Sequence, residues 1–256
     1  MEEKIVVLTP ERHHIILELL RRKHNVKIQE FAEKTNSSES TIRRDLSQLE
    51  KEKKLKRVHG GASIVQQKAQ ELSILEKSMI NTNEKNIIAK YAANLINNGD
   101  CIYLDAGTTS YQMIPYIESK KIKVVTNGFT HLDALLEKEI ETYIIGGYVK
   151  NKTRALIGSG AIDSLSRYRF DKCFIGVNGI HLDYGYTTPD PEEAKVKRTA
   201  MNLAQETYVL ADDSKFNEVA FAQISDLKQA TIITNQVEQE ILDDFLKQTK
   251  IKVVTS

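Results

Sequence analysis

The stretch that decides the fold of the N-terminal region is residues 38–50, Ser-Glu-Ser-Thr-Ile-Arg-Arg-Asp-Leu-Ser-Gln-Leu-Glu. Ile42, Leu46 and Leu49 fall at positions i, i+4 and i+7, so they share one face of a helix. Ser38 is a good N-cap, and the spacing predicts a helix that begins there and runs to about Lys51. The opposite face carries a polar set with hydroxyls and arginines near the N-terminus: Glu39, Ser40, Thr41, Arg43, Arg44 and Gln48.

The residues before this stretch predict two further helices and a tight connection. Thr9-Pro10 can open a helix that ends near His24, and a shorter amphipathic stretch runs from Ile28 to Thr35. Asn36-Ser37 then turns the chain into the third helix. Two short helices joined by a tight turn, the second with exposed arginines, are typical of a helix-turn-helix that inserts its second helix into the major groove of DNA.

The residues after this stretch predict a wing. Residues 55–62, Leu-Lys-Arg-Val-His-Gly-Gly-Ala, alternate charged and apolar side chains and end in a glycine pair. We interpret them as a hairpin whose cations meet the DNA backbone. An alternative is that Arg43 and Arg44 only pair with Asp45 or Glu39 on a solvated helix face. The expected DNA-binding residues are Ser38, Ser40, Thr41, Arg43, Arg44, Lys56, Arg57 and His59.

The charge of the chain is divided between its two ends. The 256 residues contain 36 Lys or Arg and 35 Asp or Glu, which excludes a wholesale polycation, and 41% hydrophobic residues disfavour a disordered chain. Residues 1–60 contain 14 basic and 10 acidic residues, whereas residues 61–256 contain 22 and 25. A basic N-terminal part on a slightly acidic larger part favours contact of the smaller part with an anion such as nucleic acid.

The N-terminal motifs resemble a known family. The core Thr-Ile-Arg-Arg-Asp-Leu (residues 41–46) and the wing end His-Gly-Gly-Ala (residues 59–62) are similar to the DNA-binding domain of the DeoR family of bacterial transcriptional repressors. The resemblance implies a winged helix-turn-helix over residues 8–62. Residues 1–7 exceed what the family usually shows, and no function is predicted for them.

The rest of the chain predicts an α/β domain. Residues 63–82 are polar and suit a linker or connecting helix, and residues 83–256 alternate between strand and helix patterns. Such alternation indicates a mostly parallel, Rossmann-like sheet covered by helices. The predicted strands lie near residues 101–104, 123–126, 142–145, 172–177, 207–210, 231–234 and 252–254, and the predicted helices near 84–96, 110–117, 192–205 and 238–247.

Small and polar residues follow five of these strands, where ligands bind in such sheets. Asp105-Ala-Gly-Thr-Thr-Ser leads from a strand into a helix, and glycine, hydroxyls and a helix N-terminus suit an oxyanion. Neither a Walker loop nor Gly-x-Gly-x-x-Gly is present, so one small phosphate ester fits better than a nucleotide. A simple turn explains any single loop of this kind, but five converging strand ends favour a site. Lys215 can neutralise the phosphate, and Asp105, Asn178 and Glu193 can bind sugar hydroxyls.

The order of these motifs resembles the sensor domain of the same family, which is related to ribose-5-phosphate isomerase and glucosamine-6-phosphate deaminase. Residues 100–109, 170–182, 184–194 and 214–219 are similar to fructose-operon repressors of Gram-positive bacteria. The resemblance implies a sugar-phosphate pocket and fructose 1-phosphate as inducer. The expected effector-binding residues are Asp105, Gly107, Thr108, Thr109, Asn127, Gly128, Asn178, Gly179, Glu193 and Lys215.

The sequence therefore predicts a cytoplasmic repressor that binds operator DNA as a dimer or tetramer and is released by a sugar phosphate. A transcriptional activator with the same modules stays open as an alternative, because whether the protein represses or activates depends on where the operator lies relative to the promoter. An isomerase-like enzyme also stays open, with Asp105, Glu193 and Lys215 as acid/base groups.

No cofactor or metal site is expected, and Cys101 and Cys173 are expected to be reduced thiols inside strands. No run approaches the roughly 18 apolar residues of a membrane span, and the first eight residues do not resemble a secretory signal.

Overall fold

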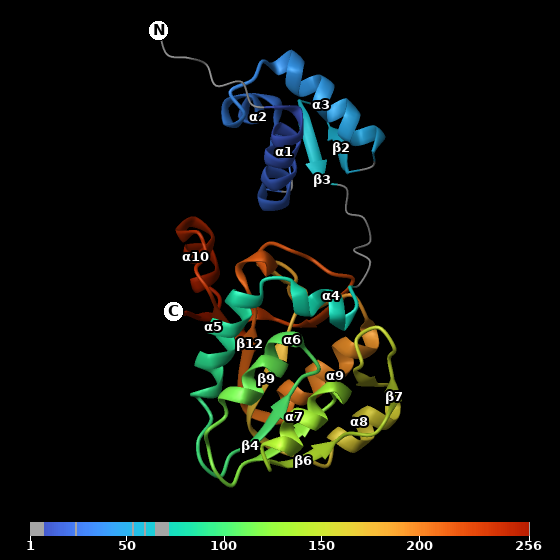
Figure 1. The fold of residues 1–256 in the computed structure, drawn as a ribbon, viewed down its shortest axis with the longest axis vertical. Helices are drawn as coiled ribbons and strands as arrows, with labels where there is room; N and C mark the ends of the chain where they lie inside the picture. Colours follow the sequence, from blue (N-terminus) through green and yellow to red (C-terminus); the bar gives the residue numbers. More distant parts are fainter. Residues whose placement is uncertain (1–7, 24, 53, 59, 65–71, 256) are drawn as a thin grey trace. The chain divides into compact units, whose positions relative to one another are not determined.

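The computed structural model describes residues 8–23, 25–52, 54–58, 60–64 and 72–255, which form parts of two compact units, residues 1–68 and 69–256 (Figure 1). Residues 1–7 and His59 lie outside the described residues, as do residues 65–71 of the predicted linker. The division into residues 8–62, 63–82 and 83–256 stays a prediction. Each unit is described by itself.

The smaller unit is a winged helix-turn-helix. Its elements in chain order are α1 (Thr9–Lys23), β1 (Asn25–Lys27), α2 (Ile28–Lys34), α3 (Glu39–Lys51), β2 (Leu55–Val58) and β3 (Gly61–Ile64). The strands form an antiparallel sheet in the order β1-β3-β2, so the predicted hairpin is confirmed and gains a third strand that the sequence did not predict.

The predicted amphipathicity of α3 explains how the smaller unit packs. Ser38 caps the helix, because the Thr41 amide donates to the Ser38 hydroxyl at 3.3 Å. Ile42, Leu46 and Leu49 are fully buried in one core with α1 and α2. The polar face of α3 is left at the surface of this unit.

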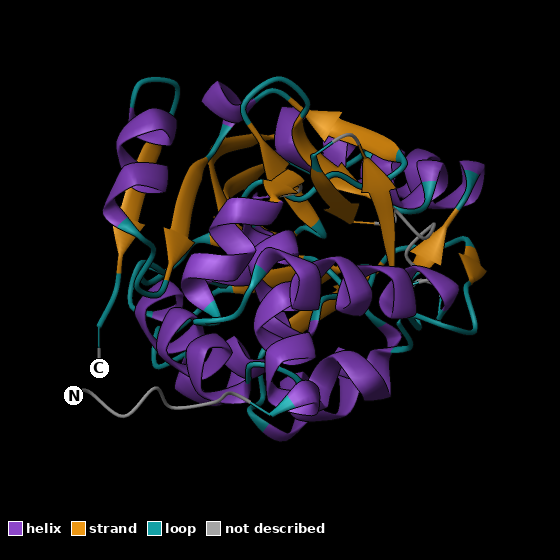
Figure 2. Cartoon of the chain, turned by 90° about the horizontal axis from the view of Figure 1, so that it is seen from above, coloured by secondary structure: helices purple, strands orange, loops and turns teal. Residues whose placement is uncertain are grey.

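The larger unit is built on a seven-stranded, wholly parallel sheet (Figures 1 and 2). In spatial order the strands are β15 (Lys250–Val253), β14 (Thr231–Thr234), β12 (Ala204–Leu210), β9 (Phe170–Gly176), β4 (Cys101–Leu104), β5 (Lys123–Thr126) and β6 (Glu141–Ile144). The chain moves outward from β4 to β6, returns to β9, and then moves outward in the opposite direction. The direction of winding therefore reverses between β4 and β9, as in the Rossmann order. The predicted α/β fold class is confirmed.

Helices cover both faces of this sheet. Ile102 and Leu104 of β4 belong to one apolar cluster, whereas Tyr103 belongs to the other, as expected for alternating side chains. Helices α5 (Thr82–Ala93), α6 (Thr108–Met113) and α7 (Leu132–Glu137) pack on the first face. Helices α8 (Ser159–Leu165), α9 (Pro191–Asn202) and α10 (Gln239–Leu246) contribute to the second cluster.

Several elements of the larger unit were not predicted. A small antiparallel sheet joins β10 (Gly179–His181), β11 (Gly185–Thr188) and β13 (Ala222–Ser225), and β7 (Tyr148–Val149) pairs with β8 (Leu156–Ile157). Within residues 63–82, where the sequence suits a linker or a connecting helix, residues 74–79 do form a helix, α4 (Ile74–Met79). Cys101 and Cys173 are free thiols, and no described helix is long and apolar enough to cross a membrane.

Candidate functional site

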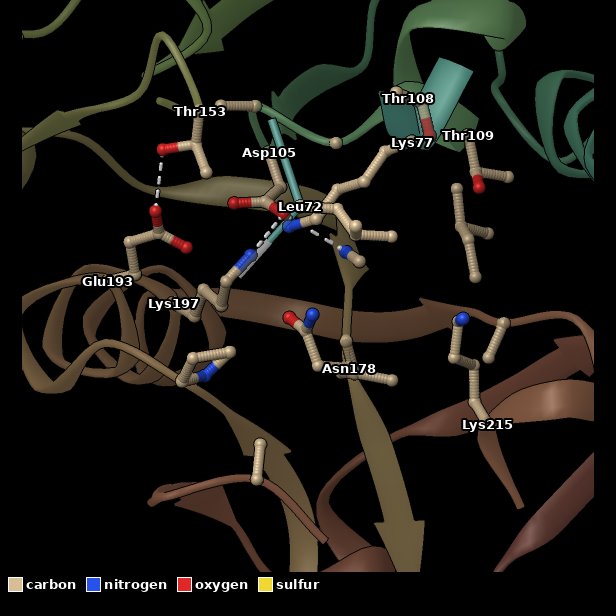
Figure 3. Close-up of a pocket in the computed structure, with 18 of the residues that line it drawn as sticks. Leu72, Lys77, Asp105, Thr108, Thr109, Thr153, Asn178, Glu193, Lys197 and Lys215 are labelled. Carbon is tan, nitrogen blue, oxygen red and sulfur yellow. Dashed lines mark hydrogen bonds and ion pairs between the residues drawn. The ribbon is translucent and has the colours of Figure 1, made fainter. Parts of the chain in front are cut away.

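A pocket of about 240 Å³ opens at the carboxyl ends of β4 and β9, where the winding of the sheet reverses. Loops that follow parallel strands meet at this edge, so residues far apart in sequence converge there (Figure 3). Eight of the ten predicted effector residues line the pocket: Asp105, Gly107, Thr108, Thr109, Asn127, Asn178, Glu193 and Lys215.

Asp105, directly after β4, offers a hydrogen-bond acceptor to a ligand. Its side chain is 1% exposed. One carboxylate oxygen, Oδ2, accepts from the Lys197 ammonium and from the Gly176 amide at 3.1 Å. The other oxygen, Oδ1, is buried and has no hydrogen-bond partner among the described residues. A buried acceptor without a partner is costly, and a ligand hydroxyl would satisfy it.

Glu193, at the start of α9, is a second carboxylate in the pocket. Its Oε1 accepts from the Thr153 hydroxyl at 2.7 Å and from the Lys150 ammonium at 3.1 Å. Burial opposes ionisation, but the Lys197 charge and the bonds from Thr153 and Lys150 together hold the pKa of Glu193 below its usual value. Glu193 is therefore ionised at neutral pH and can accept hydrogen bonds only.

Cations and backbone amides line another part of the pocket. Lys215 follows β12, and its Nζ lies 4.0 Å from Asp212 Oδ2 and 3.1 Å from Ser214 Oγ. Thr108 and Thr109 form the first turn of α6, which no described side chain caps. The amides of that turn are thus free of a side-chain acceptor and suit an anion. Figure 3 shows Lys215 and Glu193 on opposite sides of the pocket.

Asn127 and Asn178 hydrogen-bond to neighbouring segments of the site. The buried Asn127 accepts from the Ala106 amide at 2.9 Å, which fixes the loop after Asp105. Asn178 accepts from the Thr188 hydroxyl at 3.2 Å. Both side chains position the walls of the pocket, and both also line it.

Gly128 and Gly179, also predicted as effector residues, are not among the residues that line the pocket. A Cβ at Gly128 would lie 2.0 Å from the Nδ1 atom of His131. A Cβ at Gly179 would lie 2.3 Å from the carbonyl oxygen of Glu218. Close packing accounts for glycine at both positions.

The sequence prediction missed six polar or charged residues of the pocket: Lys77, Lys85, Thr153, Lys197, Asp212 and Glu218. Lys197 follows Glu193 by four residues on α9, so helical spacing could have placed both on one face. Figure 3 shows both projecting from α9, with Lys197 directed at Asp105. No local pattern marks Lys85 or Thr153, because the fold alone brings them to the pocket. Within the described residues, no group of three or more His, Cys, Asp or Glu could hold a metal ion.

The N-cap and the polar face of α3 carry five of the eight predicted DNA-binding residues: Ser38, Ser40, Thr41, Arg43 and Arg44. Ser38 Oγ lies 2.9 Å from both Ser40 Oγ and Thr41 Oγ1, so these hydroxyls form one cluster at the start of the helix. Arg43 and Arg44 are exposed, and Arg43 donates to Glu39 at 3.1 Å. This pair is the solvated arrangement that the sequence left open as an alternative, and an exposed pair of this kind is weak enough to yield to a phosphate or base.

The wing packs against α3 through polar contacts. Arg57 donates from its side chain to Ser47 Oγ at 2.9 Å, and its amide donates to Glu50 at 2.8 Å. Lys56 is exposed on the same strand. The structure therefore places cations of the wing and the face of α3 on one small unit.

Asp45 has a different partner from the one considered in the sequence. It is buried and bonds to Arg12 of α1, with Nε–Oδ2 and Nη2–Oδ1 distances of 2.5 and 3.1 Å. The suggestion that Asp45 pairs with Arg43 or Arg44 is therefore wrong. Asp45 instead fixes α3 against α1 and leaves both arginines at the surface.

Comparisons with known proteins agree with this two-part organisation. Residues 12–68 match the DeoR-like helix-turn-helix domain, and residues 80–236 match the DeoR C terminal sensor domain. The uncharacterized HTH-type transcriptional regulator FruR of Bacillus subtilis (strain 168) is 50% identical over 249 residues, which cover 97% of this chain and 99% of the relative. The HTH-type transcriptional repressor GlcR of the same organism is 34% identical, covering 96% of each chain.

The lactose phosphotransferase system repressor of Lactococcus lactis subsp. lactis is 35% identical, covering 92% of this chain and 95% of the relative. Among solved structures, ribose 5-phosphate isomerase A from Methanocaldococcus jannaschii is 19% identical, with a TM-score of 0.40 over 53% of this chain and 55% of that one. The relatives that match nearly the whole chain are transcriptional regulators, not enzymes. With both domains matched, the chain belongs to the DeoR family of helix-turn-helix transcriptional regulators, which join a DNA-binding domain to a sugar-sensing domain.

Proposed function

We propose that this protein represses a sugar-utilisation operon, most specifically one for fructose, and leaves its operator when a phosphorylated sugar binds the pocket. Fructose 1-phosphate is the inducer that we propose. The 50% identity to a regulator named FruR supports the fructose assignment, and the two relatives named as repressors support the sign of regulation.

The observation that carries the proposal is the division of the pocket into two chemically different parts. Lys215 and the uncapped first turn of α6 supply a cation and backbone donors, which suit a phosphate group. Asp105 Oδ1 and the Glu193 carboxylate supply acceptors, which suit sugar hydroxyls. A ligand with a phosphate at one end and hydroxyls at the other satisfies both.

In this proposal the chain acts on DNA in the cytoplasm as a homodimer or homotetramer. A symmetric dimer would read repeated half-sites, with the recognition helices about one helical turn, or roughly 10 bp, apart. The inducer can release the protein from the operator only if it binds the protein state with low DNA affinity more tightly than the state with high DNA affinity. A coupling of about 1–3 kcal/mol would change operator affinity roughly 5- to 150-fold.

A thermal-shift series tests the ligand. A compound that binds only the folded state raises the apparent midpoint by mass action. We expect fructose 1-phosphate to raise the midpoint of the larger unit and fructose 6-phosphate to leave it unchanged. The reverse order, or no response to either compound, would reject the inducer.

Variants of the pocket test the site. Lys215→Ala and Thr108→Val should keep operator binding and lose release by fructose 1-phosphate, because both remove groups from the phosphate part of the pocket. Lys90→Ala is the matched control, since Lys90 is an exposed lysine of α5 that does not line the pocket. Normal release with Lys215→Ala and Thr108→Val would reject the assignment of the pocket.

A further inference from the structure

Helix α4 lies at the pocket although it has no buried residue. Leu72, Ile74, Lys77 and Ile80 line the pocket, yet Leu75 and Met79 are 70% and 80% exposed. Burial of apolar surface therefore contributes little to holding this helix. The position of α4 must depend on polar contacts at its two ends.

Those contacts attach α4 to three parts of the larger unit. At its start, the Ile74 amide donates to the carbonyl oxygen of Lys152 at 2.9 Å. Directly after its end, the Asn81 side chain donates to Asp212 Oδ1 at 2.9 Å. Between them, the Lys85 ammonium donates to the carbonyl oxygen of Ile80 at 2.6 Å and to that of Lys77. Both carbonyls are at the end of α4, where a cation is favourable.

Lys85 belongs to the pocket as well as to this attachment. It projects from α5, is 6% exposed and lines the pocket. Burial lowers its pKa, because an ammonium without full hydration is costly to keep charged, and Asp212 opposes that effect. An ammonium has three N–H donors, and the two carbonyls of α4 accept two of the bonds that it can make.

We propose that Lys85 is a positioning residue that couples the phosphate of a bound effector to α4. A phosphate dianion in the pocket would accept the third N–H of the Lys85 ammonium, and its negative charge would favour the charged form of Lys85. Because the same ammonium holds the carbonyls of Lys77 and Ile80, effector binding would tighten the attachment of α4. Helix α4 is the first described helix after the winged helix-turn-helix in the chain, so this change lies next in sequence to the DNA-binding unit. The inference rests on the proposed function, since it requires a phosphorylated ligand in the pocket.

Hydrogen exchange of the full-length protein tests the coupling. Amides of residues 77–80 are measured without ligand, with saturating fructose 1-phosphate, and with saturating inorganic phosphate. We expect each phosphate compound that binds to slow their exchange by about 5-fold or more in the wild type. In Lys85→Met the ligand should bind more weakly, and at saturation it should no longer slow exchange of these amides or release operator DNA. Lys90→Met is the matched control on the same helix and should behave as the wild type.

The outcomes separate the coupling from the proposed function. If fructose 1-phosphate does not bind but inorganic phosphate still slows exchange in α4, the inducer is rejected and the coupling stands. Binding of either compound to the wild type without slower exchange in α4 overturns the coupling, whether or not Lys85→Met folds. A normal ligand-induced change in Lys85→Met also overturns it. If neither compound binds, both the pocket assignment and the coupling are overturned.

Discussion

The buried pair Arg12–Asp45 gives the sharpest prediction about the DNA-binding unit. The two side chains are 9% and 4% exposed and make two bonds, at 2.5 and 3.1 Å. Asp45→Ala removes the carboxylate and leaves the Arg12 guanidinium buried without that counter-charge. Removing one partner of a buried ion pair costs about 3–5 kcal/mol. A unit of about 60 residues has a total stability of about 3–9 kcal/mol, so the loss takes a large part of it.

Native-state hydrogen exchange is the appropriate assay, because it measures stability even where the unit stays mostly folded. A loss of about 3–5 kcal/mol makes the slowest amides of α3 exchange roughly 10²- to 4 × 10³-fold faster. Amides of α9, in the other unit, should not change and serve as an internal reference.

Two controls distinguish the buried pair from a general effect of substitution. Arg43→Ala breaks the exposed pair with Glu39, whose side chains are 55% and 48% exposed, and should change exchange by about 3-fold or less. The double variant Arg12→Met/Asp45→Leu should recover most of the lost stability, because apolar residues of similar volume can replace a buried pair. Exchange less than about 10-fold faster in Asp45→Ala would refute the reasoning. A 10-fold change corresponds to about 1.4 kcal/mol, which is well below the cost of leaving a buried charge without its partner.

Three further predictions concern DNA contacts and pH. Arg43→Ala should lose about 1–3 kcal/mol of specific operator binding and relax sequence preference if Arg43 reads a base, as measured by titration against operator and scrambled DNA; equal affinity and preference would exclude that role. Lys56→Ala should weaken binding to both DNAs alike and reduce the slope of log affinity against log salt by about one unit, whereas loss on the operator alone would contradict a phosphate contact. Burial lowers the pKa of His131 from 6.5 to about 4. The neutral ring is therefore favoured in the fold, and about 3 kcal/mol of stability, fully present above pH 6.5, is lost as the pH falls from 6.5 to 4. Urea midpoints of the larger unit, measured against pH, should show this loss in the wild type and much less of it in His131→Phe. Identical pH profiles in the two proteins would contradict the lowered pKa of His131.

The winged helix-turn-helix could be predicted because its signals are local. The apolar positions Ile42, Leu46 and Leu49 recur at helical spacing, and Ser38 stands where an N-cap belongs. The Arg12–Asp45 pair could not be predicted, because its members are 33 residues apart and only the packing of α1 on α3 brings them together. A charged residue on an amphipathic helix is normally read as exposed, which is why Arg43 and Arg44 stood as alternative partners of Asp45 in the sequence.

The sequence predicted only those residues of the pocket that follow a predicted parallel strand. Asp105, Asn178 and Lys215 each follow a strand, so the fold class alone brings them to one edge. Lys85 and Thr153 come from a helix and a turn that carry no comparable signal. Their contribution depends on which helix covers which face, and that is a property of tertiary packing rather than of local pattern.

The charges of the pocket also show why the net charge of a segment is a poor guide to its ligand. Residues 61–256 contain more acidic than basic residues, yet three of the four carboxylates that line the pocket have a lysine close by. Asp105 bonds to Lys197, Glu193 bonds to Lys150 at 3.1 Å, and Asp212 lies 4.0 Å from Lys215. Coulomb energies fall with distance and are screened by salt over about 8–10 Å, so a phosphate responds to these nearby pairs and to the first turn of α6 more than to distant surface carboxylates. For the same reason, adding acidic residues far from the pocket should change phosphate affinity little, whereas removing one lysine of a pair leaves a carboxylate that repels the ligand directly.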